Sequence, residues 1–193
     1  TQGVSSAASD VYKRQTIANN VRRGYPGDPN EYRTIGFLSV ESGDLNLLDL
    51  PSPTANRIAG FSWSSNGRLL LDRESDSATD RWLHTVNPVD GRLSEIWHDH
   101  RETRVYTSIA SAWHSDGERV VFLSDLNDRY GLYLLTPGED LPYLLTNKSF
   151  DVTGAPLINV SANRIFFQSN EPSPYERHVC LLYTSDAADD TPC

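Results

Sequence analysis

The stretch SAWHSDGERVVFLSD, at Ser111–Asp125, decides the fold of this chain. A short segment ending in an aromatic residue precedes a Ser-Asp-Gly turn, and an apolar segment rich in β-branched residues follows it. Asp-Gly between two apolar runs is a strong signal of a β-hairpin, because both residues tolerate positive φ. The stretch therefore predicts two antiparallel strands that are joined at Gly117.

The same hairpin pattern occurs at two other places in the chain. FSWSSNGRLLLD runs from Phe61 to Asp72, and a weaker copy, NVSANRIFFQ, runs from Asn159 to Gln168. The turn glycines Gly67 and Gly117 are 50 residues apart, and Gly117 is 46 residues from Asn163. A hairpin that recurs at a nearly fixed spacing indicates a repeat architecture.

A second series of turns repeats with nearly the same period. Its glycines, Gly43, Gly91 and Gly138, are 48 and 47 residues apart. Four short apolar segments fall within each period, and units of about 40–50 residues with four antiparallel strands are typical of β-propeller blades. The predicted fold class is all-β: a partial β-propeller with about two full four-stranded blades plus two half blades. Helical solenoids would show a 3.6-residue periodicity, and immunoglobulin-like arrays have units of about 100 residues.

The strands expected between these turns are short, and polar segments separate them. One such polar segment, His98–Arg104, is expected to connect the first full blade to the second. The predicted strands are 33–40, 45–50, 57–64, 68–73, 81–86, 92–97, 106–114, 119–124, 130–135 and 141–145.

Both ends of the sequence are expected to be non-native. The segments 5–15 and 180–190 translate back into a sequencing-library adaptor and its reverse complement. The flanking residues 1–4 and 190–193 fit two index sequences that are reverse complements of one another at every determined base. Such segments are excluded from fold reasoning. The expected organisation is therefore an adaptor-derived segment at 1–15, a β-propeller fragment at 16–179 and an adaptor-derived segment at 180–193.

Composition excludes several classes of protein. Cys180 and Cys193, the two cysteines of the chain, lie in the expected adaptor tail, so no thiol nucleophile is expected in 16–179. The formal net charge of −9 argues against a nucleic-acid partner, which needs a basic surface. No apolar run approaches the roughly 18–20 residues of a membrane-spanning helix, so no membrane segment is expected in this fragment.

Residues that carry chemistry are sparse. The chain has no Gly-x-Ser-x-Gly motif, which α/β-hydrolases use to expose a nucleophilic serine. His98 and His100 could lie on one face of a strand, as a metal site requires, but the expected polar connection favours a solvated loop instead. No catalytic, cofactor-binding or metal-ligating residue is therefore assigned, and no cofactor is expected.

Two other groups of residues are interpreted as structural. Trp63 and Trp113 occupy equivalent places in successive hairpins, which favours packing between blades over a ligand platform. The charged segments 72–74 and 80–81 lie near predicted strand ends and are expected to be solvated, with ion pairs that contribute ~0–1 kcal/mol each.

Four segments resemble the dipeptidyl peptidase IV family in order and spacing. They are YPGDPN at Tyr25–Asn30, FSWSSNGR at Phe61–Arg68, DLNDRYGLYLL at Asp125–Leu135 and NEPSPYERHV at Asn170–Val179. Glu31 stands where the family has a proline after the asparagine of the first motif. The positions that the resemblance identifies as structural motif residues are Tyr25, Pro26, Asn30, Trp63, Gly67, Trp113, Gly117, Glu176 and Arg177.

The resemblance implies that this chain is the non-catalytic propeller segment of a serine exopeptidase that releases N-terminal dipeptides. In that family, the propeller gates and positions peptide substrates for a C-terminal α/β-hydrolase domain, which is not in this sequence. A pair of glutamates that binds the substrate amine lies upstream of the Tyr-Pro loop in the family and would precede residue 16 here. The expected partners are a peptide substrate, bound through the full-length parent protein, and a second copy of that parent in a homodimer.

Two points stay open at the level of sequence. Composition and period alone fit a second hypothesis equally well, namely a TolB-like or WD40-like propeller scaffold for protein interaction with no attached enzyme. The compartment is also open, and only the family resemblance favours a periplasmic or extracellular location.

Overall fold

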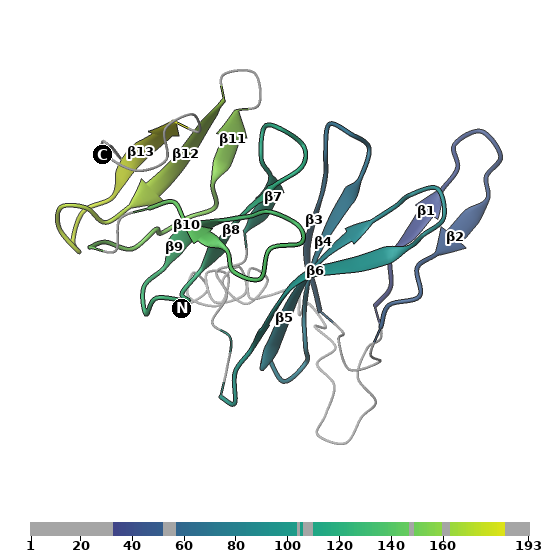
Figure 1. Cartoon of the computed structure of the whole chain (residues 1–193), viewed down its shortest axis with the longest axis horizontal. Helices are drawn as coiled ribbons and strands as arrows, with labels where there is room; N and C mark the ends of the chain where they lie inside the picture. Colours follow the sequence, from purple (N-terminus) through teal and green to yellow (C-terminus); the bar gives the residue numbers. More distant parts are fainter. Residues whose placement is uncertain are drawn as a thin grey trace, which may run out of the picture. The chain divides into compact units, whose positions relative to one another are not determined.

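The structure is a computed structural model that describes residues 33–51, 57–103, 105, 110–146, 149–159 and 163–183. Within these ranges the chain forms short β-strands (Figure 1). The strands are β1 (Gly36–Leu38), β2 (Leu45–Leu47), β3 (Arg57–Trp63), β4 (Leu69–Glu74), β5 (Asp80–Val86), β6 (Leu93–His100), β7 (Ser111–Trp113), β8 (Val120–Ser124), β9 (Gly131–Leu135), β10 (Tyr143–Leu144), β11 (Leu157–Asn159), β12 (Arg164–Ser169) and β13 (His178–Tyr183). Among the described residues, no helix has the length and hydrophobicity of a transmembrane span.

The strands form four separate antiparallel sheets. Two of them are complete four-stranded blades, with the orders β3-β4-β5-β6 and β10-β9-β8-β7. A two-stranded sheet, β1-β2, precedes them, and a three-stranded sheet, β11-β12-β13, follows them. This arrangement confirms the predicted all-β class and the partial β-propeller. The last strand, β13, runs through position 180, where the adaptor-derived tail is expected to begin.

The turn markers that defined the repeat share one backbone conformation. Gly67, Gly117 and Asn163 have φ of 75°, 70° and 51°. The glycines of the second series, Gly43, Gly91 and Gly138, also have positive φ. Left-handed backbone costs a residue with a Cβ about 1–2 kcal/mol, so the spacing of glycine and asparagine in the sequence follows the spacing of the turns.

The central strands of the two full blades, β4 and β8, are buried on both faces, and most of their residues that face neighbouring blades are apolar. On β4, Leu69 and Leu71 pack with Leu48, Leu50 and Val86 in one cluster. Leu70, between them, faces the other side and joins a second cluster with Leu83 and Trp97 of its own blade. Residues of the next blade complete that second cluster: Trp113, Val120, Phe122, Tyr133 and Leu135. Adjacent blades therefore share a core, and successive residues of β4 serve different interfaces.

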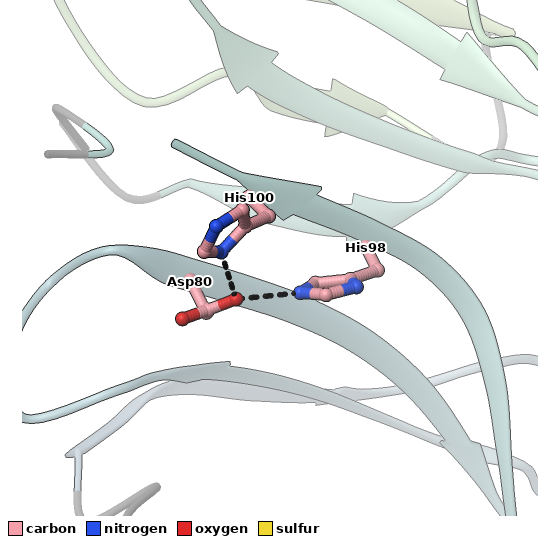
Figure 2. Close-up of side chains that lie close together, drawn as sticks. All are labelled: Asp80, His98 and His100. Atoms are coloured by element: carbon pink, nitrogen blue, oxygen red, sulfur yellow. Dashed lines mark hydrogen bonds and ion pairs between the residues drawn. The ribbon is translucent and has the colours of Figure 1, made fainter. Parts of the chain in front are cut away.

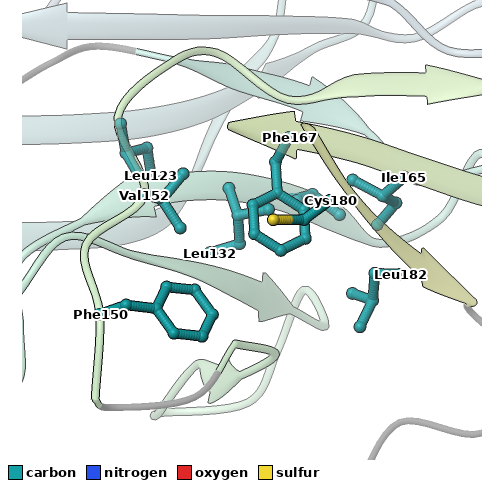
Figure 3. Packing of buried hydrophobic residues seen from close by; sticks show 9 residues of the cluster. Leu123, Leu132, Phe150, Val152, Ile165, Phe167, Cys180 and Leu182 are labelled. Atoms are coloured by element: carbon teal, nitrogen blue, oxygen red, sulfur yellow. The ribbon is translucent and has the colours of Figure 1, made fainter. Parts of the chain in front are cut away.

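A third cluster joins the second full blade to the three-stranded sheet that follows (Figure 3). Val121 and Leu123 of β8 alternate with residues that face the preceding blade, and Ile165 and Phe167 of β12 meet them. The rings of Phe150 and Phe167 are stacked, with centroids 6.5 Å apart. Cys180 and Leu182 of β13 are buried in the same cluster. Apolar faces of β8 and β12 therefore pack on each other across neighbouring blades.

One predicted boundary was wrong, namely the end of the strand that precedes His98. Residues 98–100 were expected to begin a polar connection, but they form the last part of β6. The strand continues because β5 runs alongside it: Trp82 pairs with His98, and Asp80 pairs with His100. A bulge in β6 accompanies the register shift between Leu83 and His84.

Candidate functional site

Two histidines and an aspartate meet at one end of the first full blade (Figure 2). His98 and His100 alternate along β6 and share one face, on which Asp80 of β5 also lies. The Nε2 atom of His98 is 2.9 Å from Oδ1 of Asp80, and the Nδ1 atom of His100 is 2.7 Å from the same oxygen. The potential ligand atoms of the three residues all lie within 4.8 Å of one another. Because His98 and His100 belong to a strand, the solvated loop predicted for them is wrong.

Neighbouring side chains fix the orientation of this His-His-Asp cluster. The Thr79 hydroxyl donates a hydrogen bond to Oδ2 of Asp80 at 2.7 Å, so the other carboxylate oxygen faces the imidazoles. The indole of Trp82 stacks on the His98 ring, with centroids 5.2 Å apart and planes inclined by 13°. A carboxylate and an imidazole that are held in this way lose little conformational freedom when they bind a ligand.

The electrostatics of the cluster favour an ionised carboxylate. Burial raises the pKa of Asp80, but hydrogen bonds from Thr79, His98 and His100 act in the opposite direction and outweigh it. The pKa of Asp80 is therefore lowered from its ordinary value of 3.8. At neutral pH the cluster presents one anionic oxygen to two imidazole nitrogens, which are common ligands for divalent metal ions.

The other histidines are not members of this cluster. His84 is buried in β5, His114 pairs with Asp116 at 2.9 Å, and His178 pairs with Glu176 at 2.8 Å. Within the described residues, the His-His-Asp cluster is the one group of three or more histidine, cysteine or acidic side chains close enough to share a metal ion. It is therefore the candidate metal site of the described part of the chain.

The tryptophans of the two strong hairpins have different environments. Trp113 is buried, and its indole N–H donates to the carbonyl oxygen of Ser62 in the preceding blade at 3.1 Å. The guanidinium of Arg68 lies over the Trp113 ring, 5.0 Å from its centroid. Trp63 is 54% exposed, and its ring centroid lies 5.9 Å from that of Phe37. The geometry of Trp113 is that of a residue that joins two blades.

The hairpin tips of successive blades also contact one another. Arg68 donates to the carbonyl oxygen of Gly117 at 2.9 Å, and Asn66 donates to the Glu118 carboxylate at 2.7 Å. One blade further on, the Ser115 hydroxyl donates to the side-chain oxygen of Asn163. The repeated turn thus provides contacts between successive blades.

Two of the remaining motif residues, Glu176 and Arg177, are among the described residues and lie outside the His-His-Asp cluster. Glu176 and Arg177 are exposed in the segment before β13, where Arg177 donates to the carbonyl oxygens of Pro174 and Glu176. The Tyr-Pro loop, with Tyr25, Pro26 and Asn30, lies outside the described residues. The structural roles assigned to these positions by resemblance stay predictions.

Several charged residues that were expected to be solvated are buried. Asp72, Arg73 and Glu74 of β4 and Arg81 of β5 are each at most 2% exposed. Arg81 forms a two-pronged ion pair with Asp72, its Nε at 3.0 Å from Oδ1 and its NH2 at 2.8 Å from Oδ2. Its NH1 donates to the carbonyl oxygen of Leu123 in the next blade at 2.7 Å. The expectation of a solvated surface failed because these strands lie between two other blades.

Comparison with known proteins identifies the family of the chain. The model of the dipeptidyl peptidase IV N-terminal region matches residues 6–189. The chain belongs to this dipeptidyl peptidase IV N-terminal family. A probable dipeptidyl-aminopeptidase B of Talaromyces marneffei is 26% identical over 176 aligned positions, which cover 80% of this chain and 19% of that protein. The chain therefore spans about a fifth of the length of this curated relative.

A solved structure shows the same fold. The crystal structure of Porphyromonas gingivalis dipeptidyl peptidase 4 matches 82% of this chain and 22% of that protein, with a TM-score of 0.66 and 17% sequence identity. The chain is a segment of a dipeptidyl-peptidase-IV-like N-terminal propeller. The alternative of a TolB-like or WD40-like scaffold is not favoured by these relatives.

Proposed function

We propose that this chain is the part of a serine exopeptidase that gates and positions peptide substrates. The observation that carries this proposal is the match of the dipeptidyl peptidase IV N-terminal family over residues 6–189. In the parent protein, the propeller acts with a C-terminal α/β-hydrolase domain that supplies the catalytic serine. The substrates are short or unstructured peptides with a free α-amine, which an upstream pair of glutamates holds by charge-assisted hydrogen bonds.

The contacts between blades support a gating role. A propeller restricts access to a catalytic domain only if its blades stay joined, because an open gap between blades admits larger substrates. In this segment, the shared apolar clusters, the Trp113–Ser62 hydrogen bond and the Arg81–Leu123 hydrogen bond join neighbouring blades. These residues hold the wall of the propeller, and the chemistry takes place elsewhere in the parent.

Exposed apolar side chains support the packing of further blades on this segment. Leu45 and Leu47 of β2 are 62% and 58% exposed, and Leu157 and Val179 of the three-stranded sheet are 69% and 70% exposed. Exposed faces of this kind mark surfaces that pack against another element. We infer that they contact neighbouring blades in the parent protein.

The test is the activity of the complete protein. The purified parent should release p-nitroaniline from a dipeptidyl p-nitroanilide with Pro or Ala in the second position. It should leave the same compound intact when its α-amine is acetylated, and a fluorophosphonate should label one serine and abolish activity. A complete protein with neither hydrolysis nor labelling would contradict the proposal and favour an interaction scaffold. Sedimentation of the same sample tests the homodimer.

A further inference from the structure

We propose that Asp80, His98 and His100 bind one divalent transition-metal ion, of the Zn²⁺ type, at the end of the β5–β6 ribbon. This site is independent of the peptidase role of the parent protein. The sequence alone predicted no metal ligand in the chain. Three features support it: the donor set, its geometry and its supporting contacts.

The donor set is the one that this class of metal ion prefers. Two imidazole nitrogens and one carboxylate oxygen are the three protein ligands of many zinc sites, with a fourth position left for water. The same set binds several other first-row divalent ions, whereas Mg²⁺ and Ca²⁺ prefer oxygen ligands alone. The cluster therefore selects by chemistry for Zn²⁺ and its neighbours.

The donor atoms are already close to the required spacing. In a tetrahedral zinc site with bonds of about 2.0–2.1 Å, neighbouring ligand atoms lie about 3.3 Å apart. In the structure, Oδ1 of Asp80 is 2.9 Å from the His98 nitrogen and 2.7 Å from the His100 nitrogen, and all three atoms lie within 4.8 Å of one another. Side-chain rotations that open each His–Asp contact by about half an ångström, and bring the two imidazole nitrogens to about 3.3 Å from each other, would admit the ion and replace two hydrogen bonds with metal bonds.

The backbone and the surrounding side chains hold the ligands in place. The antiparallel pairing of Asp80 with His100 fixes two ligands directly opposite each other, and the alternation of β6 places His98 on the same face. Thr79 anchors the second carboxylate oxygen, and Trp82 supports the His98 ring. Supporting contacts of this kind are what metal sites use to orient their ligands.

The site is accessible, and its location suggests what metal binding does. The side chains of His98 and His100 are 38% and 60% exposed, whereas Asp80 is 18% exposed, so an ion and its water ligand can approach from solvent. β6 is one of the two edge strands of its sheet. An ion held by β5 and β6 would clip that edge strand to the blade, which protects an exposed edge from pairing with other chains.

The test is zinc titration of the full chain, with matched variants. We expect one Zn²⁺ per chain, with a Kd that rises at least about tenfold in H98Q and in H100Q and binding that is lost in the double variant. The matched control is H178Q, because His178 also pairs with a carboxylate, Glu176, but has no third ligand among the residues that the structure describes. Its Kd should equal that of the wild type, and circular dichroism should show the same β-sheet signal for every variant.

Nuclear magnetic resonance gives a second readout that a general loss of folding would not mimic. The chain has five histidines, and the ring nitrogen signals of His98 and His100 alone should shift on addition of Zn²⁺. Absence of zinc binding by the folded wild type would overturn the proposal. So would an H98Q/H100Q chain that binds as tightly as the wild type, or ring shifts centred on His114 or His178.

Discussion

Replacement of Arg81 by methionine should destabilise the chain far more than an ordinary loss of a surface charge. Arg81 and Asp72 form a bidentate pair with both side chains at most 1% exposed. Arg81 also donates to the Leu123 carbonyl in the next blade, and its guanidinium lies 5.8 Å from the Trp97 ring and 5.6 Å from the Phe122 ring. Methionine keeps most of the apolar volume but leaves Asp72 buried without its cation.

The magnitude follows from that buried, unpaired carboxylate. Removal of one partner of a buried ion pair costs about 3–5 kcal/mol, whereas replacement of both partners by apolar residues is often nearly neutral. R81M should therefore lower the free energy of unfolding by about 3–5 kcal/mol. D72L/R81M should recover most of this loss, apart from about 1 kcal/mol for the carbonyl of Leu123.

Urea denaturation followed by tryptophan fluorescence measures these differences. The matched control is Arg129→Met, because Arg129 pairs with Asp151 at 3.1 Å but its side chain is 51% exposed. Exposed pairs contribute about 0–1 kcal/mol, so the control should stay within 1 kcal/mol of the wild type. An R81M chain as stable as the R129M control, or a double variant no more stable than R81M, would refute the buried-pair argument.

Two further predictions concern the hairpin turn and a buried histidine. Gly117→Ala should destabilise the chain more than Gly67→Ala. Both glycines have positive φ, so alanine at either position carries the left-handed penalty of about 1–2 kcal/mol. Only at Gly117 would the added Cβ also collide with the Ser65 hydroxyl of the neighbouring hairpin. Equal losses in urea denaturation would show that this contact between blades has no energetic weight. Burial, aided by the charge of Arg73, lowers the pKa of His84 from 6.5 to about 4, so the histidine stays neutral in the folded chain while the unfolded chain takes up a proton below pH 6.5. The free energy of unfolding should therefore fall as the pH drops from 6.5 towards 4, by about 2 kcal/mol between pH 7 and pH 4.5. H84Q should lack this part of the pH dependence. Parallel profiles of stability against pH for the two chains would contradict the prediction.

The repeat was predictable because its signals are local in the sequence. A turn that requires positive φ restricts the residue at that position, so Gly67 and Gly117 mark the same place in two blades. Apolar runs between the turns identified the strands that lie between neighbouring blades, such as β8. Together they were sufficient for the fold class and for the number of complete blades.

The candidate metal site was not predictable because it depends on pairing between strands. His98 and His100 look like the start of a polar loop when they are considered alone, and only their partners Trp82 and Asp80 on β5 keep them in a strand. The register that brings Asp80 opposite His100 includes a bulge, which no local pattern in the sequence reveals. The two histidines stand out in the sequence, but Asp80 could be recognised as the third ligand only when this register was known.

Burial of the charged residues was missed for a related reason. Asp72 and Arg81 lie near predicted strand ends, where charged residues are usually solvated, but the next blade covers them and supplies the Leu123 carbonyl as a hydrogen-bond acceptor. Equivalent hairpin positions also differ: Trp113 is buried, and Trp63 is 54% exposed. The environment of a residue in a repeat is set by its neighbours in the adjacent blade, which the single repeat does not encode.

The nucleotide sequence of the complete gene tests the central claim most directly. If the chain is a propeller segment of a dipeptidyl-peptidase-IV-like serine peptidase, the gene encodes a glutamate pair upstream of the Tyr-Pro loop. Downstream of the last blade it encodes a Gly-x-Ser-x-Gly motif, followed by the aspartate and histidine of a catalytic triad. A gene that ends soon after the propeller, with no hydrolase domain, would contradict the account.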